Sequence, residues 1–198
     1  FFVVGTIGTS GFFMQTIIRD LTGFDLHWIV WGLASIAACF ILARIGVDFS
    51  SKILGVCLVL EVLMLVIFDI SVLVQTGYDA AAFSPEWVFS GSLPIGLLLA
   101  ATGFLGFEAT ALFSEEAKQP LRTIPRATYT AITAIGIILG VTTWAVVSAT
   151  GVAQAQATAL EHLPTGDLIF MLSEQYLGGP LTIVMMILLL VSLFAAML

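Results

Sequence analysis

Charged side chains are scarce in this sequence: only 10% of its 198 residues are Asp, Glu, Lys or Arg, whereas 60% are hydrophobic. That hydrophobic share is well above the share found in soluble domains. The chain also has no run of basic residues, so we expect no nucleic acid partner. Together these shortages exclude an ordinary soluble domain and indicate an integral membrane protein.

Cysteine and histidine each occur only twice. Cys39 and Cys57 stand alone in apolar segments without C-x-x-C spacing, so we expect buried free thiols rather than a disulfide or a metal site. His27 and His162 fall between the apolar segments, where we expect solvated side chains. The motifs HExxH, GxSxG and the P-loop do not occur. We therefore expect no enzyme, no catalytic residue, no metal and no cofactor.

What the sequence does contain is a series of long apolar segments. A helix needs about 20 apolar residues to cross a hydrocarbon core of about 30 Å. Six segments meet this length approximately: 1–18, 28–45, 53–75, 93–112, 127–151 and 181–198. We predict an all-α, multi-pass protein of the plasma (cytoplasmic) membrane, with one transmembrane domain over 1–198. Because the chain begins and ends inside apolar runs, we expect it to be a fragment.

Basic residues orient the predicted spans, since cytoplasmic loops retain Lys and Arg. Arg44 and Lys52 flank the loop after the second segment, and Lys118, Arg122 and Arg126 occupy the loop after the fourth. The remaining loops hold a single basic residue. We therefore expect these two loops on the cytoplasmic side and the first segment to run outward.

Two loops carry helix-boundary signals. In the basic loop, Pro120 is expected to end one helix, Thr123 to cap the next and Pro125 to lie in its first turn. Between the fifth and sixth segments, Thr165 or Asp167 is expected to cap an amphipathic helix. We place this helix at about 165–177, on the outer membrane surface.

Acids inside apolar spans are the most informative residues, because an ionisable group in hydrocarbon costs several kcal/mol and must face protein or water. Glu61 and Glu108 are both predicted near the middle of the membrane. For Glu61, a structural hydrogen bond and a coupling role remain open. Asp69 is expected to be a carboxylate at the outer interface.

The stretch from Gly103 to Glu108 combines two glycines, Gly103 and Gly106, with an acid inside an apolar run. We predict a discontinuous helix near residues 102–108, whose unpaired backbone groups bind a polar solute. The alternative is that Glu108 is a structural acid in the first turn of the following helix. The glycines of GTIGTSG in the first segment are instead expected to serve helix packing.

The segment GFLGFEATALFSEEAKQPLRTIPRATY resembles the sixth helix, inner loop and start of the seventh helix in amino-acid permeases of the amino acid/polyamine/organocation (APC) superfamily. The segment SSKILGVCLVLEVLMLVIFDI is similar to the fifth helix, and SEQYLGGPLTIVMMILLLVSLFAA is similar to the eighth. The resemblance implies that the chain forms helices three to eight of a LeuT-like fold with two inverted five-helix repeats.

The resemblance also implies roles for individual residues. Glu108 matches an acid linked to the inner gate and to proton coupling, and Glu61 stands where several proton-coupled relatives carry a lysine. Ser192 lies near the place where sodium-dependent relatives bind their ion. Three hydroxyl residues of the first segment could line the pocket or serve polar packing: Thr6, Thr9 and Ser10. The backbone that binds the substrate's amino group is implied at Thr102, Gly103, Phe104, Leu105, Gly106 and Phe107, with Phe104 or Phe107 as an aromatic lid.

These features predict a secondary transporter in the lipid bilayer that carries an amino acid or related amine by alternating access. Proton coupling is favoured over sodium coupling, because a carboxyl group that changes its exposure to water can exchange a proton. The alternatives are a non-transporting membrane scaffold or subunit, whose glycines serve only helix packing, and an ion channel.

Overall fold

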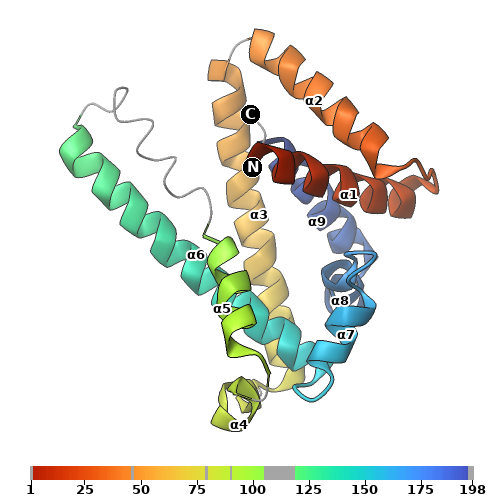
Figure 1. Cartoon of the computed structure of the whole chain (residues 1–198), viewed down its shortest axis with the longest axis vertical. Coiled ribbons are helices and arrows are strands. Elements are labelled where there is room, and N and C mark those ends of the chain that lie inside the picture. The colour runs from red at the N-terminus through yellow and green to blue at the C-terminus, as the bar shows by residue number, and fades with distance from the viewer. Residues whose placement is uncertain (1, 46, 79, 90, 105–118, 196–198) are drawn as a thin grey trace. The chain divides into compact units, whose positions relative to one another are not determined.

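In the computed structural model, residues 2–45, 47–78, 80–89, 91–104 and 119–195 are described, and their regular elements are helices (Figure 1). No strand occurs in these ranges, which confirms the predicted all-α class for them. The elements are α1 (Phe2–Thr22), α2 (Trp28–Ile45), α3 (Val47–Thr76), η1 (Ala81–Phe83), α4 (Pro85–Val88), α5 (Leu93–Thr102), α6 (Pro120–Thr150), α7 (Ala155–Glu161), α8 (Leu168–Leu177) and α9 (Gly179–Ala195).

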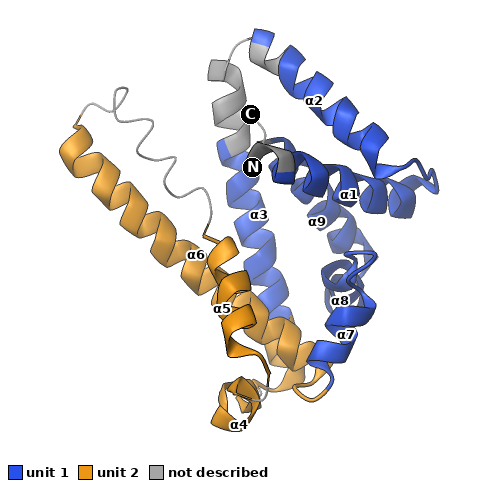
Figure 2. Ribbon diagram, in the orientation of Figure 1, with its two compact units in different colours: residues 1–71, 154–198 blue, residues 72–153 orange. Residues whose placement is uncertain are grey.

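The chain divides into two compact units, residues 1–71 with 154–198 and residues 72–153 (Figure 2). In the first unit α9 packs against both α1 and α8. Ile17 of α1, Phe170 of α8 and Met186 of α9 form one buried apolar cluster at this junction. The helices of this unit are thus held by large side chains that meet around α9.

The contact between α1 and α2 is the most extensive helix contact described in the first unit, and it includes a close backbone approach at one glycine. A Cβ on Gly11 would lie 2.6 Å from the Trp28 carbonyl oxygen and 3.1 Å from the Gly32 nitrogen. The two backbones therefore touch where a side chain would stand. Gly5 and Gly8 have no such neighbour within 4 Å. The predicted packing role is therefore confirmed for Gly11, whereas for Gly5 and Gly8 it stays a prediction.

In the second unit η1 contacts both α4 and the long helix α6. The ring of Phe83, at the end of η1, meets the Trp144 ring of α6 edge-on, with centroids 5.4 Å apart. Such edge-to-face pairs contribute about 0.5–1.5 kcal/mol beyond the apolar area that they bury.

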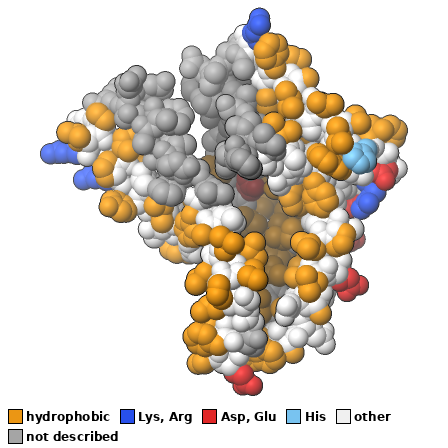
Figure 3. All heavy atoms as spheres, viewed as in Figure 1, with side chains coloured by type: hydrophobic (Ala, Val, Ile, Leu, Met, Phe, Trp, Pro, Cys, Tyr) orange, Lys and Arg blue, Asp and Glu red, His pale blue; other side chains and the backbone are white. Residues whose placement is uncertain are grey.

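Large apolar side chains are exposed on the helices of both units. Val59 and Leu98 are each 66% exposed, and Ile137 of α6 is 61% exposed. Hydrophobic side chains also cover much of the described surface that is visible in Figure 3, whereas charged side chains appear there as isolated patches. Exposure on this scale is unfavourable in water but is expected where helices face lipid.

Two described helical segments, Gly55–Thr76 and Pro120–Thr150, are long and apolar enough to cross a membrane. Shorter apolar stretches occupy α2, α5 and α9. Hardly any residue of Pro120–Thr150 is buried inside the protein. Its apolar side chains therefore need lipid or another apolar partner around them. These helices support a membrane protein.

The structure corrects two expectations from the sequence. Helix α6 begins at Pro120, with Gln119 as N-cap and Pro125 inside the helix, so Thr123 is not the cap. The reason is that proline suits the first helical position, where its missing N–H has no partner to lose. Asp69 is only 4% exposed, so it is buried against protein rather than an open interfacial carboxylate.

Candidate functional site

Helix α5 ends at Thr102, at the start of the predicted break. The backbone N–H groups of Gly103 and Phe104 donate to the carbonyls of Ala100 and Ala101, each over 3.1 Å. These bonds span three residues instead of four, so the α-helical ladder tightens and stops. Gly103 keeps right-handed dihedral angles, φ −65° and ψ −14°. The described end of α5 is therefore a turn, and it does not need a left-handed glycine.

This turn packs on the middle of α6. A Cβ on Gly103 would lie 2.7 Å from Cδ1 of Leu139, and a Cβ on Gly136 would lie 3.6 Å from the Phe104 ring. Gly136 and Leu139 are three residues apart and thus share a face of α6. Phe104, one of the two predicted lid residues, rests on this face. The other predicted substrate contacts and the gate acid lie outside the described residues: Leu105, Gly106, Phe107 and Glu108.

Glu61 and Ser192, which the sequence singles out on separate segments, meet in the first unit. The Glu61 carboxyl of α3 is hydrogen-bonded to the Ser192 hydroxyl of α9. Both residues are half-buried. Close by, Met64 of α3 packs with Met185 and Leu188 of α9 in a buried cluster. The carboxyl group is thus fixed beside an apolar contact between two helices.

Of the three hydroxyl residues of α1 that could line a pocket, Thr9 and Ser10 each donate to a carbonyl of their own helix, and Thr6 is half-buried. Thr9 donates to the Gly5 carbonyl over 3.0 Å, and Ser10 donates to the Ile7 carbonyl over 3.2 Å. Ser10 is fully buried, whereas Thr9 is exposed. These bonds satisfy the hydroxyls without a ligand, as polar packing residues do.

The loop between α7 and α8 contains a polar network that the sequence does not predict. His162 Nδ1 lies 2.7 Å from Asp167 Oδ1, and the Thr165 hydroxyl also donates to that carboxylate. Burial would raise the pKa of Asp167, but the hydrogen bonds from Thr165 and His162 outweigh it and hold this pKa below its ordinary value. Asp167 occupies the N-cap position of α8, yet its side chain makes no cap bond.

The same loop is fixed to α1. The Thr16 hydroxyl donates to the Thr165 carbonyl over 3.0 Å. Gly166, with φ of +66°, lies so close to the Phe12 ring that a Cβ there would be 2.7 Å from Cε1. The expectation of a solvated His162 is therefore wrong, because its ring is part of a loop that is docked on a helix. The sequence signal was the spacing of His162 and Asp167, which alone does not indicate contact.

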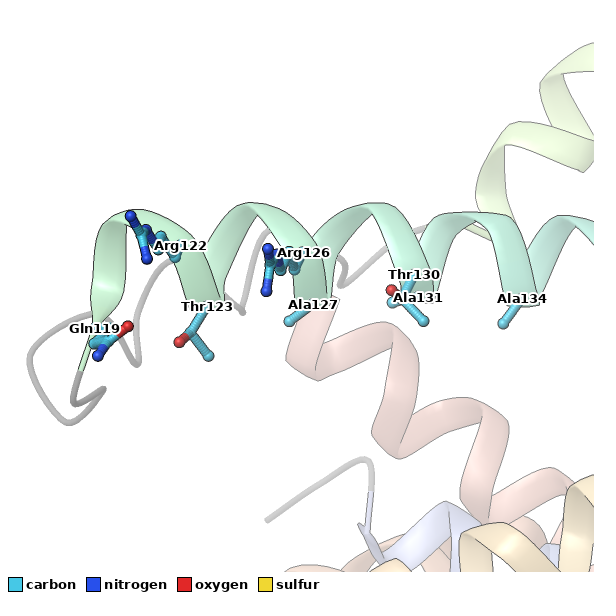
Figure 4. Close-up of a pocket in the computed structure, with 8 residues that line it drawn as sticks. All are labelled: Gln119, Arg122, Thr123, Arg126, Ala127, Thr130, Ala131 and Ala134. Atoms are coloured by element: carbon cyan, nitrogen blue, oxygen red, sulfur yellow. The ribbon is translucent and has the colours of Figure 1, made fainter.

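One face of α6 lines a hollow on the protein surface, and we call it the basic stripe (Figure 4). Its members recur every three or four residues, as on one side of a helix. They are Gln119, Arg122, Thr123, Arg126, Ala127, Thr130, Ala131 and Ala134. The stripe changes from charged at its start to small and apolar at its end.

The described part of the chain contains no group of side chains suited to bind a metal ion. Within it, no three His, Cys, Asp or Glu side chains are grouped so that they could hold a metal ion. The polar groups described above form pairs and loop bonds instead.

The comparisons with known proteins give the family. A search of curated proteins and a search of solved structures each returned no match. A family model described as amino acid permease matches residues 1–198, which is the whole chain. The match agrees with the apolar helices and with transport rather than enzymatic activity. The chain therefore belongs to the amino acid permease family, whose members are membrane proteins that carry amino acids.

Proposed function

We propose that the chain forms helices three to eight of a secondary transporter, which moves an amino acid or related amine across the cytoplasmic membrane by alternating access. The observation that carries this proposal is the match of the amino acid permease model to all 198 residues. The end of α5 at Thr102 supports it. A helix that ends within a membrane leaves backbone groups that a polar solute can satisfy.

The substrate's amino group is assigned to the backbone of residues 102–107. Carbonyl oxygens are suitable partners for an ammonium group, because each offers two lone pairs and the group carries three donors. The Thr102 hydroxyl donates to the Leu99 carbonyl over 2.6 Å, so its oxygen keeps lone pairs that can also accept from the ammonium group. Phe104 or Phe107 would cover the bound solute as an aromatic lid.

Proton coupling is assigned to Glu61 or Glu108. The hydrogen bond from Ser192 favours a role for Glu61, because it holds the carboxyl group at a helix contact that can change during alternating access. A sodium ion at Ser192 is the less favoured coupling, since one hydroxyl and one carboxyl supply few of the oxygen ligands that a hard cation needs.

A non-transporting scaffold is the second candidate. It is favoured by the contact of Phe104 with Gly136, which gives the glycine and the aromatic ring a packing role without a ligand. The bond between Glu61 and Ser192 can likewise be purely structural. The two candidates differ in whether any solute stabilises the folded protein.

The experiment is thermal unfolding of the intact permease in detergent with a panel of amino acids and amines. A transporter gains about 2.7 kcal/mol when its solute is present at 100 times the dissociation constant, whereas a scaffold is indifferent to every solute. Uptake by the Glu108→Gln variant then tests coupling. Accumulation driven by a pH gradient that equals that of the parent protein removes Glu108 from the coupling role.

A further inference from the structure

The basic stripe of α6 has a second feature that substrate transport does not require, namely two exposed arginines close together near its start. Arg122 and Arg126 are one helical turn apart on this stripe, and both are exposed (Figure 4). Neither forms an ion pair with another described residue. Two guanidinium groups at this spacing offer several donors to a single phosphate group.

The start of the helix adds to the positive charge of these arginines. Gln119 is the N-cap of α6 but makes no side-chain cap bond, and the helix that follows has 31 residues. The first turn of a helix carries free N–H groups and a partial positive charge. The arginines and the helix end therefore attract an anion to the same place.

The remainder of the stripe is shaped for an apolar chain. After the arginines its members are small: Ala127, Thr130, Ala131 and Ala134. These small side chains line the part of the hollow beyond the arginines, which we call the channel. Because this channel continues directly from the arginines, a ligand that combines a phosphate with a hydrocarbon chain fits both parts, whereas a free phosphate uses only one.

The length of α6 places the two parts at suitable depths. A helix of 31 residues is about 46 Å long, so it exceeds a hydrocarbon core of about 30 Å and its ends reach the headgroup region. Tyr129 is 74% exposed just past the arginines, as is common for rings at the membrane interface. The arginines then lie at the level of lipid phosphates and the alanines at the level of acyl chains.

We propose that the basic stripe binds one anionic phospholipid of the cytoplasmic leaflet, with its phosphate on Arg122 and Arg126 and an acyl chain along the alanines. The proposal rests on the membrane orientation given by the basic loops, but it is independent of whether the protein transports. Anionic lipids are abundant in cytoplasmic leaflets and attract basic residues near the surface.

The test is native mass spectrometry of the intact permease with phosphatidylglycerol or phosphatidylcholine. A basic residue near an anionic surface contributes about fivefold in binding, so Arg122→Gln/Arg126→Gln should lower the preference for phosphatidylglycerol by about 30-fold. Arg122→Lys/Arg126→Lys keeps the charge and should keep most of the preference. Arg44→Gln removes one positive charge at the end of α2, at an exposed residue outside the stripe, and should have little effect.

Three outcomes overturn the proposal. The first is an unchanged preference for phosphatidylglycerol in the double glutamine variant. The second is an equal loss of thermal stability in both lipids, which would assign the arginines to contacts within the protein. The third is full competition by inorganic phosphate, which would make the site a phosphate site without a lipid chain. None of these measurements involves uptake, so failure here leaves the transport proposal intact.

Discussion

The Glu61 carboxyl on α3 is hydrogen-bonded to the Ser192 hydroxyl on α9, and the bond lies next to the apolar contact between the two helices. Glu61 precedes Met64 by three residues and Ser192 follows Leu188 by four, so each polar residue shares a helix face with a member of the buried cluster. Any sliding of α9 along α3 therefore changes the surroundings of the carboxyl group.

Glu61→Gln should uncouple uptake from the pH gradient. One pH unit corresponds to about 1.4 kcal/mol, so a gradient of that size drives about tenfold accumulation when one proton accompanies each solute. The amide keeps the size of the side chain and can still accept from Ser192, but it does not titrate. We expect accumulation to disappear while solute exchange continues, as measured in proteoliposomes that contain the intact permease.

The matched control for this experiment is Glu174→Gln, which removes an exposed carboxyl of α8 and should retain accumulation. Ser192→Ala should shift the pH at which uptake is half-maximal, because it removes a hydrogen bond to the carboxyl group. If Glu61→Gln accumulates solute as well as the parent protein does, coupling belongs to Glu108 or to another group.

Gly11→Ala should destabilise the packing of α1 on α2. The new Cβ would stand 2.6 Å from the Trp28 carbonyl oxygen, which is backbone and cannot rotate away. Overpacking of this kind costs about 1–3 kcal/mol. Gly8→Ala is the control, since it has no neighbour within 4 Å and gains up to about 1 kcal/mol in helix propensity. Thermal unfolding in one detergent compares them, and equal melting temperatures would contradict the close contact.

The helical class of this chain is predictable from its sequence, whereas the helix ends are less so. In lipid, the backbone N–H and C=O groups of an apolar run find no water, and a helix pairs them all within the run. The start of α6 is harder, because both Pro120 and Thr123 carry start signals, and the choice between them depends on the surrounding chain.

The sequence predicts the individual residues of the candidate site, but it does not predict which of them are in contact. Glu61 and Ser192 each stand out as polar groups in apolar helices, yet their pairing depends on how α3 and α9 are rotated about their axes. The contact of Phe104 with Gly136 likewise depends on tertiary packing. Periodicity within one helix contains no information about either. The His162 and Asp167 pair depends on the turn at Gly166, which brings the two side chains together within a short loop.

The loop between α7 and α8 should lose stability in acid. The pKa of Asp167 is below its ordinary value of 3.8, so the folded loop favours the ionised carboxylate. Its contribution to stability is therefore present at neutral pH and is lost as the pH falls below about 4, through the folded-state pKa. The protection of amides 162–167 against hydrogen exchange, measured relative to the unfolded chain at the same pH, should fall over this range in the parent protein.

Asp167→Asn should remove that acid dependence and raise the exchange rate of the loop already at neutral pH. Thr16→Val serves as a second variant, because it breaks the bond to the Thr165 carbonyl without changing any charge. It should lower the protection of the loop by the same factor at all pH values. An acid dependence that persists in Asp167→Asn would assign it to another carboxyl group.

Gly103→Ala should weaken solute binding because the new methyl group meets Leu139 of α6. Gly103 has right-handed dihedral angles that alanine also adopts, so the backbone itself allows the change. The obstacle is Leu139 Cδ1, 2.7 Å from the new Cβ, which pushes the turn and its carbonyls away from α6. We expect about fivefold weaker binding, which corresponds to about 1 kcal/mol of overpacking.

Gly103→Ala/Leu139→Ala should restore binding to nearly that of the parent protein, since the shorter side chain on α6 makes room for the methyl group. Leu139→Ala alone is the control and should bind normally, because this leucine is 42% exposed and loses little packing. The measurement is the solute-dependent shift in melting temperature of the intact permease. Weak binding in the double variant would mean that the turn needs glycine itself and not merely space beside α6. Normal binding in Gly103→Ala would mean that the turn is not part of the substrate site.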